Sequence, residues 1–273
     1  MSGSGTNAEA LLRYRAEHSG CRFVPALIVT DAPETGRARE VAARWNVPLA
    51  ELDIRAFYAA RGEEAISLVS DRRRAIRAEW TDALRALIAP WKIEFGVLAG
   101  FVPLCNIAAD MPCLNVHPGD LTREAGGKRI LAGLHYRPVE TAILAGHPAL
   151  RSSVILAQPF EGSGEADMDS GPVLGVSAPM PVELDGETTG SLAAVQALRT
   201  RAPYRDRLRE LAERNLERLK VCGDHVVLPR VADDFAAGRF GVDGGKLCFR
   251  DDGGGWTAVR TVEYGTDGRR LLQ

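Results

Sequence analysis

Short apolar runs of strand length alternate with longer amphipathic stretches through the first two thirds of this chain, and no other feature constrains the fold as much. Residues 24–30 (VPALIVT) and 95–101 (FGVLAGF) form continuous apolar runs that predict buried strands. Residues 37–45 and 205–220 instead place apolar side chains at helical spacing. Such alternation is typical of βαβ units, so we expect an α/β fold with a Rossmann-like, mostly parallel sheet.

The same apolar patterns predict further elements along the chain. Further strands are expected at residues 49–52, 114–116, 153–158 and 173–176, and further helices at 63–87 and 138–144. Residues 221–273 are rich in Gly and Asp and contain short β-like runs between turn signals. We therefore predict an α/β domain over residues 1–220 and a small β-rich C-terminal extension over residues 221–273.

Composition narrows the classes of partner. The chain has 273 residues, 45% of them apolar and 26% charged, with a net charge of −2, so disorder is excluded and no electrostatic feature favours nucleic acid or an anionic membrane. No apolar stretch reaches the length of a membrane span, and no signal segment opens the chain. These features predict a soluble cytoplasmic protein, and any anionic ligand must be held locally.

The cysteines are odd in number and lack CxxC spacing. There are five, at positions 21, 105, 113, 222 and 248. This pattern favours reduced, mostly buried thiols over a disulfide framework. The sequence also offers no compact set of His and Cys ligands, so we expect no metal.

The segment Ser2–Asn7 (SGSGTN) is the first of three clusters that could carry chemistry. It leads directly into a helical stretch, AEALLRYRAE. Glycines allow a tight turn, and the N–H groups at a helix start favour an anion, so the segment is a candidate phosphate cradle. A flexible chain terminus is the structural alternative.

The second cluster is LNVHPGDL, at residues 114–121. Asn115 and His117 are two residues apart, so on a strand their side chains point to one face. Pro118 and Gly119 end the strand there, at the edge where open α/β sheets bind ligands. An amide donor beside an imidazole suits a developing oxyanion or general base catalysis, although a lone histidine is more often structural.

The third cluster is DMDSGPV, at residues 167–173. Asp169 lies 52 residues after His117, since 169 − 117 = 52, and this distance has room for one more βα unit. Both side chains could then reach the same edge of the sheet. A carboxylate beside an imidazole favours its charged form and fixes its orientation. The alternative is a turn aspartate bonded to backbone amides.

The order SGSGTN, VLAGF, LNVHP, DSGPV resembles the formyltetrahydrofolate-dependent formyltransferases, and in particular the glycinamide ribonucleotide formyltransferases of purine biosynthesis. The resemblance implies a catalytic triad of Asn115, His117 and Asp169. It implies a phosphate site formed by Gly3, Ser4, Gly5, Thr6 and Asn7. It implies folate contacts from Leu98, Ala99, Gly100, Phe101 and Val102, and a pterin pocket that includes Glu165, Ala166, Asp167 and Met168.

The implied activity is transfer of a formyl group from 10-formyltetrahydrofolate, as co-substrate, to a primary amine. The amine is glycinamide ribonucleotide or a similar phosphate-bearing amine, and the protein is a monomer or a homodimer. Three alternatives stay open. They are a formyltransferase for an amino sugar nucleotide or another amine, a 10-formyltetrahydrofolate hydrolase, and an inactive homologue that binds folate or a nucleotide.

Two departures from the family pattern bear on these alternatives. Family members have a buried strand before the phosphate loop, whereas here Met1 directly precedes it. Either the start lies upstream, or the sheet lacks a strand and the cradle is mobile. The segment after His117 also differs from the family's Pro-Ser-Leu-Leu-Pro and reads PGDLT at residues 118–122. Because this loop borders the acceptor site in the family, the acceptor could differ.

Overall fold

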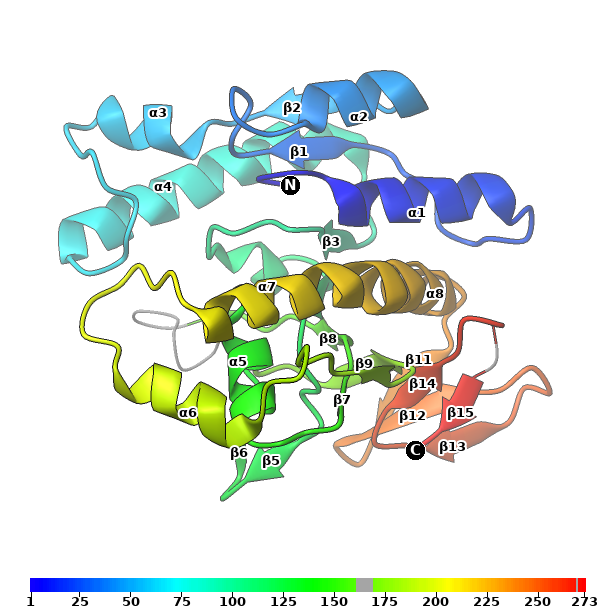
Figure 1. The fold of residues 1–273 in the computed structure, drawn as a ribbon. Helices are drawn as coiled ribbons and strands as arrows, with labels where there is room; N and C mark the ends of the chain where they lie inside the picture. The colour runs from blue at the N-terminus through cyan, green and yellow to red at the C-terminus, as the bar shows by residue number, and fades with distance from the viewer. Residues whose placement is uncertain (161–168, 269) are drawn as a thin grey trace. The chain divides into compact units, whose positions relative to one another are not determined.

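Short strands and helices alternate along the chain, as the apolar runs predict, in a computed structural model that describes residues 1–160, 169–268 and 270–273 (Figure 1). The chain forms two compact units. Unit 1 contains residues 1–115 and 156–171, and unit 2 contains residues 116–155 and 172–273. The domain boundary expected after residue 220 stays a prediction.

Unit 1 begins with a helix and continues with short parallel strands and the helices between them. Its helices are α1 (Thr6–Glu17), α2 (Ala38–Trp45), α3 (Ile54–Ala59) and α4 (Asp71–Ile88), with 3₁₀ turns η1 (Ala89–Trp91) and η2 (Asn106–Ala109). Its strands are β1 (Ile28–Thr30), β2 (Leu49–Glu51), β3 (Gly96–Leu98) and the first residues of β4 (Cys113–His117).

The helix α4 begins later than its apolar pattern predicts. The side chain of Ser70 accepts a hydrogen bond from the backbone N–H of Arg73, which caps the helix at that point. Residues before the cap form a loop, and the carbonyl of Ile66 in that loop accepts a hydrogen bond from the buried Arg77 guanidinium at 2.5 Å. The expected helix over residues 63–87 is therefore wrong for its first two turns.

The largest buried side chains of unit 1 pack between α3 and α4. Trp80 and Tyr58 are fully buried in a cluster with Ile54, Ile76 and Leu84. Burial of each large apolar side chain of this kind stabilises the fold by about 1.5–3 kcal/mol. Phe101, which follows β3, packs against this cluster, with its ring centroid 6.1 Å from that of Trp80.

The strands β1 and β3 do not share a neighbouring strand within the described residues. β1 pairs in parallel with β2, whereas β3 pairs in parallel with β4 and lies at the edge of its sheet. The start of the chain joins the two. The Met1 ammonium donates to the Val29 carbonyl at 2.6 Å, and the Ser2 N–H donates to the Gly100 carbonyl at 3.1 Å.

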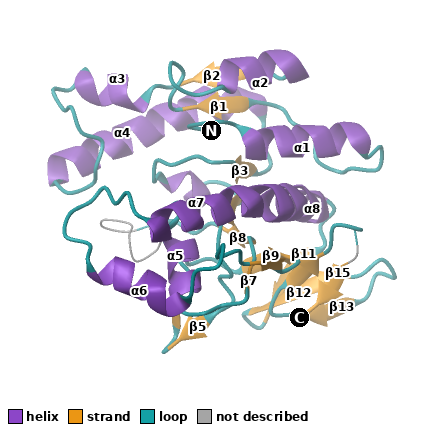
Figure 2. Cartoon of the chain, in the orientation of Figure 1, coloured by secondary structure: helices purple, strands orange, loops and turns teal. Residues whose placement is uncertain are grey.

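Unit 2 contains the remaining elements (Figure 2). Its helices are α5 (Arg137–Leu144), α6 (Thr189–Ala197), α7 (Arg207–Leu219) and α8 (His225–Ala236), and the π-helical segment η3 (Lys220–Asp224) joins the last two. Its strands before α6 are β5 (Glu124–Ala125), β6 (Lys128–Arg129), β7 (Ala149–Leu150), β8 (Ser153–Leu156), β9 (Val173–Ser177) and β10 (Met180–Pro181). Its later strands are β11 (Phe240–Asp243), β12 (Lys246–Arg250), β13 (Trp256–Ala258), β14 (Val262–Tyr264) and β15 (Arg270–Leu272).

The largest sheet is mixed, with parallel and antiparallel pairs. Its strand order is β15-β14-β9-β8-β4-β3. The pairs β3–β4 and β9–β14 are parallel, whereas β8–β9 and β14–β15 are antiparallel. The α/β class is thus confirmed.

The C-terminal region differs from the β appendage expected there. Residues 225–236 form the helix α8, in which the apolar side chains of Val227, Leu228, Val231 and Ala232 are buried. Pro229 lies inside this helix, and proline is a helix breaker in a sequence pattern. The strands β11, β12 and β13 do form a small antiparallel sheet, but β14 joins the large sheet beside β9.

The five cysteines form no disulfide bonds. Cys21, Cys113 and Cys248 are buried, which confirms the expected mostly buried thiols. Across residues 1–160, 169–268 and 270–273, no helix combines the length and apolar character that crossing a membrane requires.

The packing of α8 and β14 onto β9 leads to a stability prediction. A Cβ atom on Gly175 would lie 2.5 Å from a Val231 methyl group and 2.7 Å from the Tyr264 ring. We expect Gly175→Ala to lower the free energy of unfolding by about 1–3 kcal/mol because neither neighbour can move away. Thermal unfolding measures this change.

Gly190 in α6 provides the matched control. The nearest atom to an added Cβ is 3.8 Å away, so Gly190→Ala should leave the melting temperature unchanged or raise it. Equal melting temperatures for the wild type and Gly175→Ala would contradict the packing of α8 and β14 on β9.

Candidate active site

The strand β4 carries two of the side chains that the sequence singles out. Asn115 and His117 both lie within it, two residues apart, so the alternation of a strand directs them to one face. Asn115 is half-buried, whereas His117 is only 3% exposed. The chain turns directly after His117, where the Gly119 N–H donates to the His117 carbonyl at 2.9 Å. The expected position of this pair at the end of the strand is confirmed.

The His117 ring has a backbone partner. Its Nε2 lies 2.7 Å from the carbonyl oxygen of Leu131. A carbonyl oxygen only accepts hydrogen bonds, so Nε2 carries a proton and donates it. A buried imidazole thus has a defined tautomer whenever it is neutral, with its proton on Nε2.

The loop between His117 and α5 contains an exposed hairpin. The strands β5 and β6 pair antiparallel across Gly126 and Gly127, both with positive φ, as a two-residue hairpin turn requires. The base of the loop is buried, since Leu121 and Leu131 are 0% and 3% exposed. The altered sequence after His117 therefore forms an ordered structure that is anchored on both sides of the hairpin.

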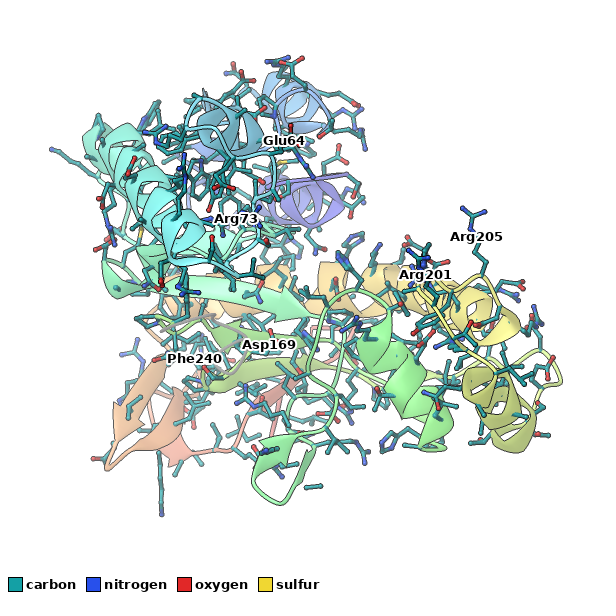
Figure 3. All side chains as sticks on the ribbon, turned by 90° about the vertical axis from the view of Figure 1, so that its left-hand side faces the viewer. Glu64, Arg73, Asp169, Arg201, Arg205 and Phe240 are labelled. Carbon is teal, nitrogen blue, oxygen red and sulfur yellow. The ribbon has the colours of Figure 1, made fainter. Side chains whose placement is uncertain are left out.

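Asp169 lies in a tight turn before β9 (Figure 3). Its φ is +62°, in the left-handed region that aspartate adopts more readily than most residues, and it is buried. A Cβ on Gly171 would collide with the Leu156 carbonyl, so this position requires glycine. The turn that the DSGP pattern predicts is present, and the role of Asp169 stays a prediction.

The expected pterin-pocket residues Glu165, Ala166, Asp167 and Met168 lie outside the described residues. Phe160, which precedes these residues in the chain, makes two backbone hydrogen bonds with the side chain of Asn106. The Asn106 side-chain N–H donates to the Phe160 carbonyl at 3.1 Å, and its side-chain oxygen accepts from the Phe160 N–H at 2.9 Å.

The N-terminal segment forms a turn at the start of α1. Gly5 caps this helix with φ +72°, in the left-handed region where a residue with a side chain is strained, so the turn favours glycine. The cap residue offers no side-chain acceptor to the first helical N–H groups, which an anion could accept from instead. The Arg37 N–H donates to the Gly3 carbonyl at 3.1 Å, which adds a cationic residue beside the loop.

Within unit 1, Ser2 connects the two segments that are expected to bind the substrates. The Ser2 hydroxyl donates to Asp31 at 2.6 Å and accepts from the Val102 N–H at 2.9 Å. The segment 2–7, expected to hold a phosphate, thus lies against the segment 98–102, expected to contact folate. Gly100 between them has φ +63° and turns the chain away from β3.

Asp31 is the residue that the sequence reasoning missed. It is 5% exposed and directly follows β1. Burial raises its pKa, while the Ser2 hydroxyl and the Met1 ammonium act in the opposite direction. Its position directly after a predicted strand could have identified it as a candidate, since residues at the carboxyl ends of strands line the ligand site of such sheets.

The Ser2 hydroxyl gives a pH-dependent prediction. Ser2→Ala removes a donor to the Asp31 carboxylate and an acceptor for the Val102 N–H, at a cost of about 1–3 kcal/mol in unfolding free energy. The hydroxyl lowers the pKa of Asp31, so its stabilising effect is present where Asp31 is ionised and declines as the pH falls. Urea unfolding should show a larger loss at about pH 7.5 than at about pH 5.

Ser4→Ala is the control because Ser4 is exposed in the same segment. It should change stability by less than about 0.5 kcal/mol at either pH. A loss for Ser2→Ala that is absent, or that grows on acidification, would contradict the contact between Ser2 and Asp31.

Solved structures with the same fold give the site a context. Glycinamide ribonucleotide transformylase 1 from Symbiobacterium toebii is 22% identical, with a TM-score of 0.55 over 92% of each chain. The phosphoribosylglycinamide formyltransferase from Coxiella burnetii is 18% identical, with a TM-score of 0.55 over 90% of this chain and 89% of that one. A formyltetrahydrofolate deformylase from Pseudomonas syringae pv. tomato is 12% identical, with a TM-score of 0.55 over 92% of this chain and 64% of that one.

Comparison of the sequence alone adds nothing to this, since no protein-family model and no curated protein matches the chain. At these low identities the likeness establishes the fold. The chain has the fold of the glycinamide ribonucleotide formyltransferases and of a formyltetrahydrofolate deformylase, which confirms in three dimensions the resemblance that its motifs indicate.

Proposed function

We propose that this protein transfers a formyl group from 10-formyltetrahydrofolate to a primary amine. The observation that carries the proposal is the pair Asn115 and His117 on one face at the end of β4, in a chain with the formyltransferase fold. An amide and an imidazole on one strand face are suited to an oxyanion that forms beside them.

The proposed reaction begins with attack by the uncharged amine on the formyl carbon. A carbon–nitrogen bond forms, and the carbonyl oxygen becomes the oxyanion of a tetrahedral intermediate. The bond from this carbon to N10 of the folate then breaks, and a proton passes from the attacking nitrogen to N10. The formyl group needs no other activation, because it is already bound to a nitrogen that leaves once protonated.

Each of the three residues has a role in this proposal. Asn115 donates a hydrogen bond to the oxyanion, and His117 stabilises the same charge. Asp169 favours the charged form of the imidazole and orders a water molecule that relays the proton. Removal of one oxyanion donor of this kind costs about 10²–10³ in rate.

The remaining predicted residues would hold the two substrates. Residues 98–102 and 165–168 contact the folate in this proposal. Gly3, Ser4, Gly5, Thr6 and Asn7 hold a phosphate of the acceptor. The uncapped start of α1 supports an anion at this place, whereas the Arg37 guanidinium is already paired with Glu40 at 2.6 Å and lies 3.8 Å from Glu9. We therefore propose glycinamide ribonucleotide, or a similar phosphate-bearing amine, as acceptor.

Hydrolysis of 10-formyltetrahydrofolate is the second candidate. The fold of the Pseudomonas syringae deformylase supports it as a candidate. Water replaces the amine in that reaction, and formate is the product. An acceptor other than glycinamide ribonucleotide, such as an amino sugar nucleotide, would need the same residues on β4 without the phosphate loop.

Substitution of the three proposed catalytic residues tests the assignment. We expect Asn115→Ala, His117→Ala and Asp169→Ala each to reduce formyl transfer by about 10²-fold or more, with the circular dichroism spectrum unchanged. The assay follows 10-formyltetrahydrofolate consumption with a panel of amines and without amine. Gly190→Ala, which lies in α6, serves as the control with full activity. Turnover close to the wild type in any of the three variants would contradict the role given to that residue.

A further inference from the structure

The loop that follows His117 contacts the imidazole through a backbone carbonyl. The Leu131 carbonyl oxygen accepts from Nε2, and both groups are buried in unit 2. Leu131 is fourteen residues further along the chain, beyond the β5–β6 hairpin. Its side chain is 3% exposed and belongs to an apolar cluster with Val139, Ile143 and Leu150. The carbonyl is therefore fixed by the core rather than by the exposed hairpin.

Gly119 makes this contact sterically possible. A Cβ at this position would lie 2.5 Å from the Leu131 carbonyl oxygen, 2.9 Å from His117 Nε2 and 3.1 Å from its Cδ2. Any side chain at residue 119 would force the carbonyl and the ring apart. Because Gly119 has no positive φ, its role is to leave space for this close approach.

Ser153 on β8 prevents Gly119 from moving out of the way. Its hydroxyl donates to the Gly119 carbonyl at 2.7 Å and accepts from the Leu121 N–H at 3.0 Å. Ser153 is completely buried. The turn after β4 is thus held by a side chain of the neighbouring strand on one side, and lies against the imidazole on the other.

The hydrogen bond decides which ring nitrogen can take part in chemistry. Donation to a carbonyl keeps a proton on Nε2 in both the neutral and the charged ring. The ring then gains and loses its second proton at Nδ1.

We propose that Gly119 and the Leu131 carbonyl are positioning elements of the candidate site, which hold the proton of His117 on Nε2 and fix the orientation of its ring. The role of these elements in the reaction rests on the proposed function, whereas the expected tautomer of His117 does not. Gly119 and the loop sequence around it belong to this chain's own departure from the family pattern.

The tautomer of His117 in the ligand-free protein is the decisive observation. Nitrogen–proton NMR correlation spectra of ¹⁵N-histidine-labelled protein distinguish the two neutral tautomers, and the signal that is lost in His117→Gln identifies this residue. We expect the neutral ring to carry its proton on Nε2. A neutral ring with its proton on Nδ1 would overturn the proposal, whether or not the protein transfers formyl groups.

Gly119→Ala then tests positioning against a purely structural role. The expected result is a changed ¹⁵N signature of His117 and a fall in kcat of about 10²-fold with little change in KM, because a misplacement of about 1 Å suffices for such a loss. Gly190→Ala should match the wild type in both. A folded Gly119→Ala protein with the wild-type signature and kcat would overturn the proposal.

Ser153→Ala keeps the test available if Gly119→Ala fails to fold. It adds no volume and removes only the hydroxyl that holds the turn. We expect a smaller shift of the His117 signature in the same direction and a lower kcat, and an unchanged signature would count against the proposal. If the tautomer is as expected but the wild type transfers no formyl group, the positioning stands and the proposed function fails.

Discussion

The buried hydrogen bond between the His117 imidazole and the Leu131 carbonyl is the interaction on which the rest of the candidate site depends. A buried imidazole without hydrogen-bond partners would destabilise the fold, so a later part of the chain must supply a partner for it. This contact requires a glycine at position 119, a serine on β8 to hold the turn, and an apolar anchor for Leu131. The loop after His117, which departs from the family pattern, is therefore shaped by the residue at the end of β4.

The N-terminal segment is the proposed anion site of a chain with a net charge of −2. In this proposal the anion is held by backbone N–H groups rather than by a basic surface. Gly5 gives the turn that opens α1, and Ser2 ties this turn to Asp31 and to the segment after β3. The buried carboxylate of Asp31 stabilises the Ser2 hydroxyl orientation, so the two predicted substrate segments of unit 1 share one polar contact. A local site of this kind agrees with the absence of any strong overall charge.

Much of the fold could be predicted from apolar runs, because strands and amphipathic helices need them. The positions of β4, α2 and α7 follow directly from the sequence. The strands predicted from the apolar runs 24–30 and 95–101 were wrong in their extent, since β1 and β3 have three residues each, Val24 is 74% exposed, and β3 is a half-buried edge strand. Pattern reasoning failed where one residue overrode it. Ser70 caps α4 two turns late, and Pro229 conceals α8 in a region that otherwise has β character. Side-chain motifs predicted Asn115, His117 and Asp169 as site residues, and their role stays a prediction, but a backbone carbonyl fourteen residues from His117 has no signature in a sequence.

The fate of the formyl carbon tests the central claim most directly. The protein is incubated with 10-formyltetrahydrofolate labelled with ¹³C in the formyl group, together with glycinamide ribonucleotide, its dephosphorylated riboside, or no amine, and the label is followed by NMR. The account predicts that the label appears in a new formamide with glycinamide ribonucleotide, more slowly with the riboside, and hardly at all as formate. Release of labelled formate at the same rate with and without amine, or no turnover with any acceptor, would contradict it.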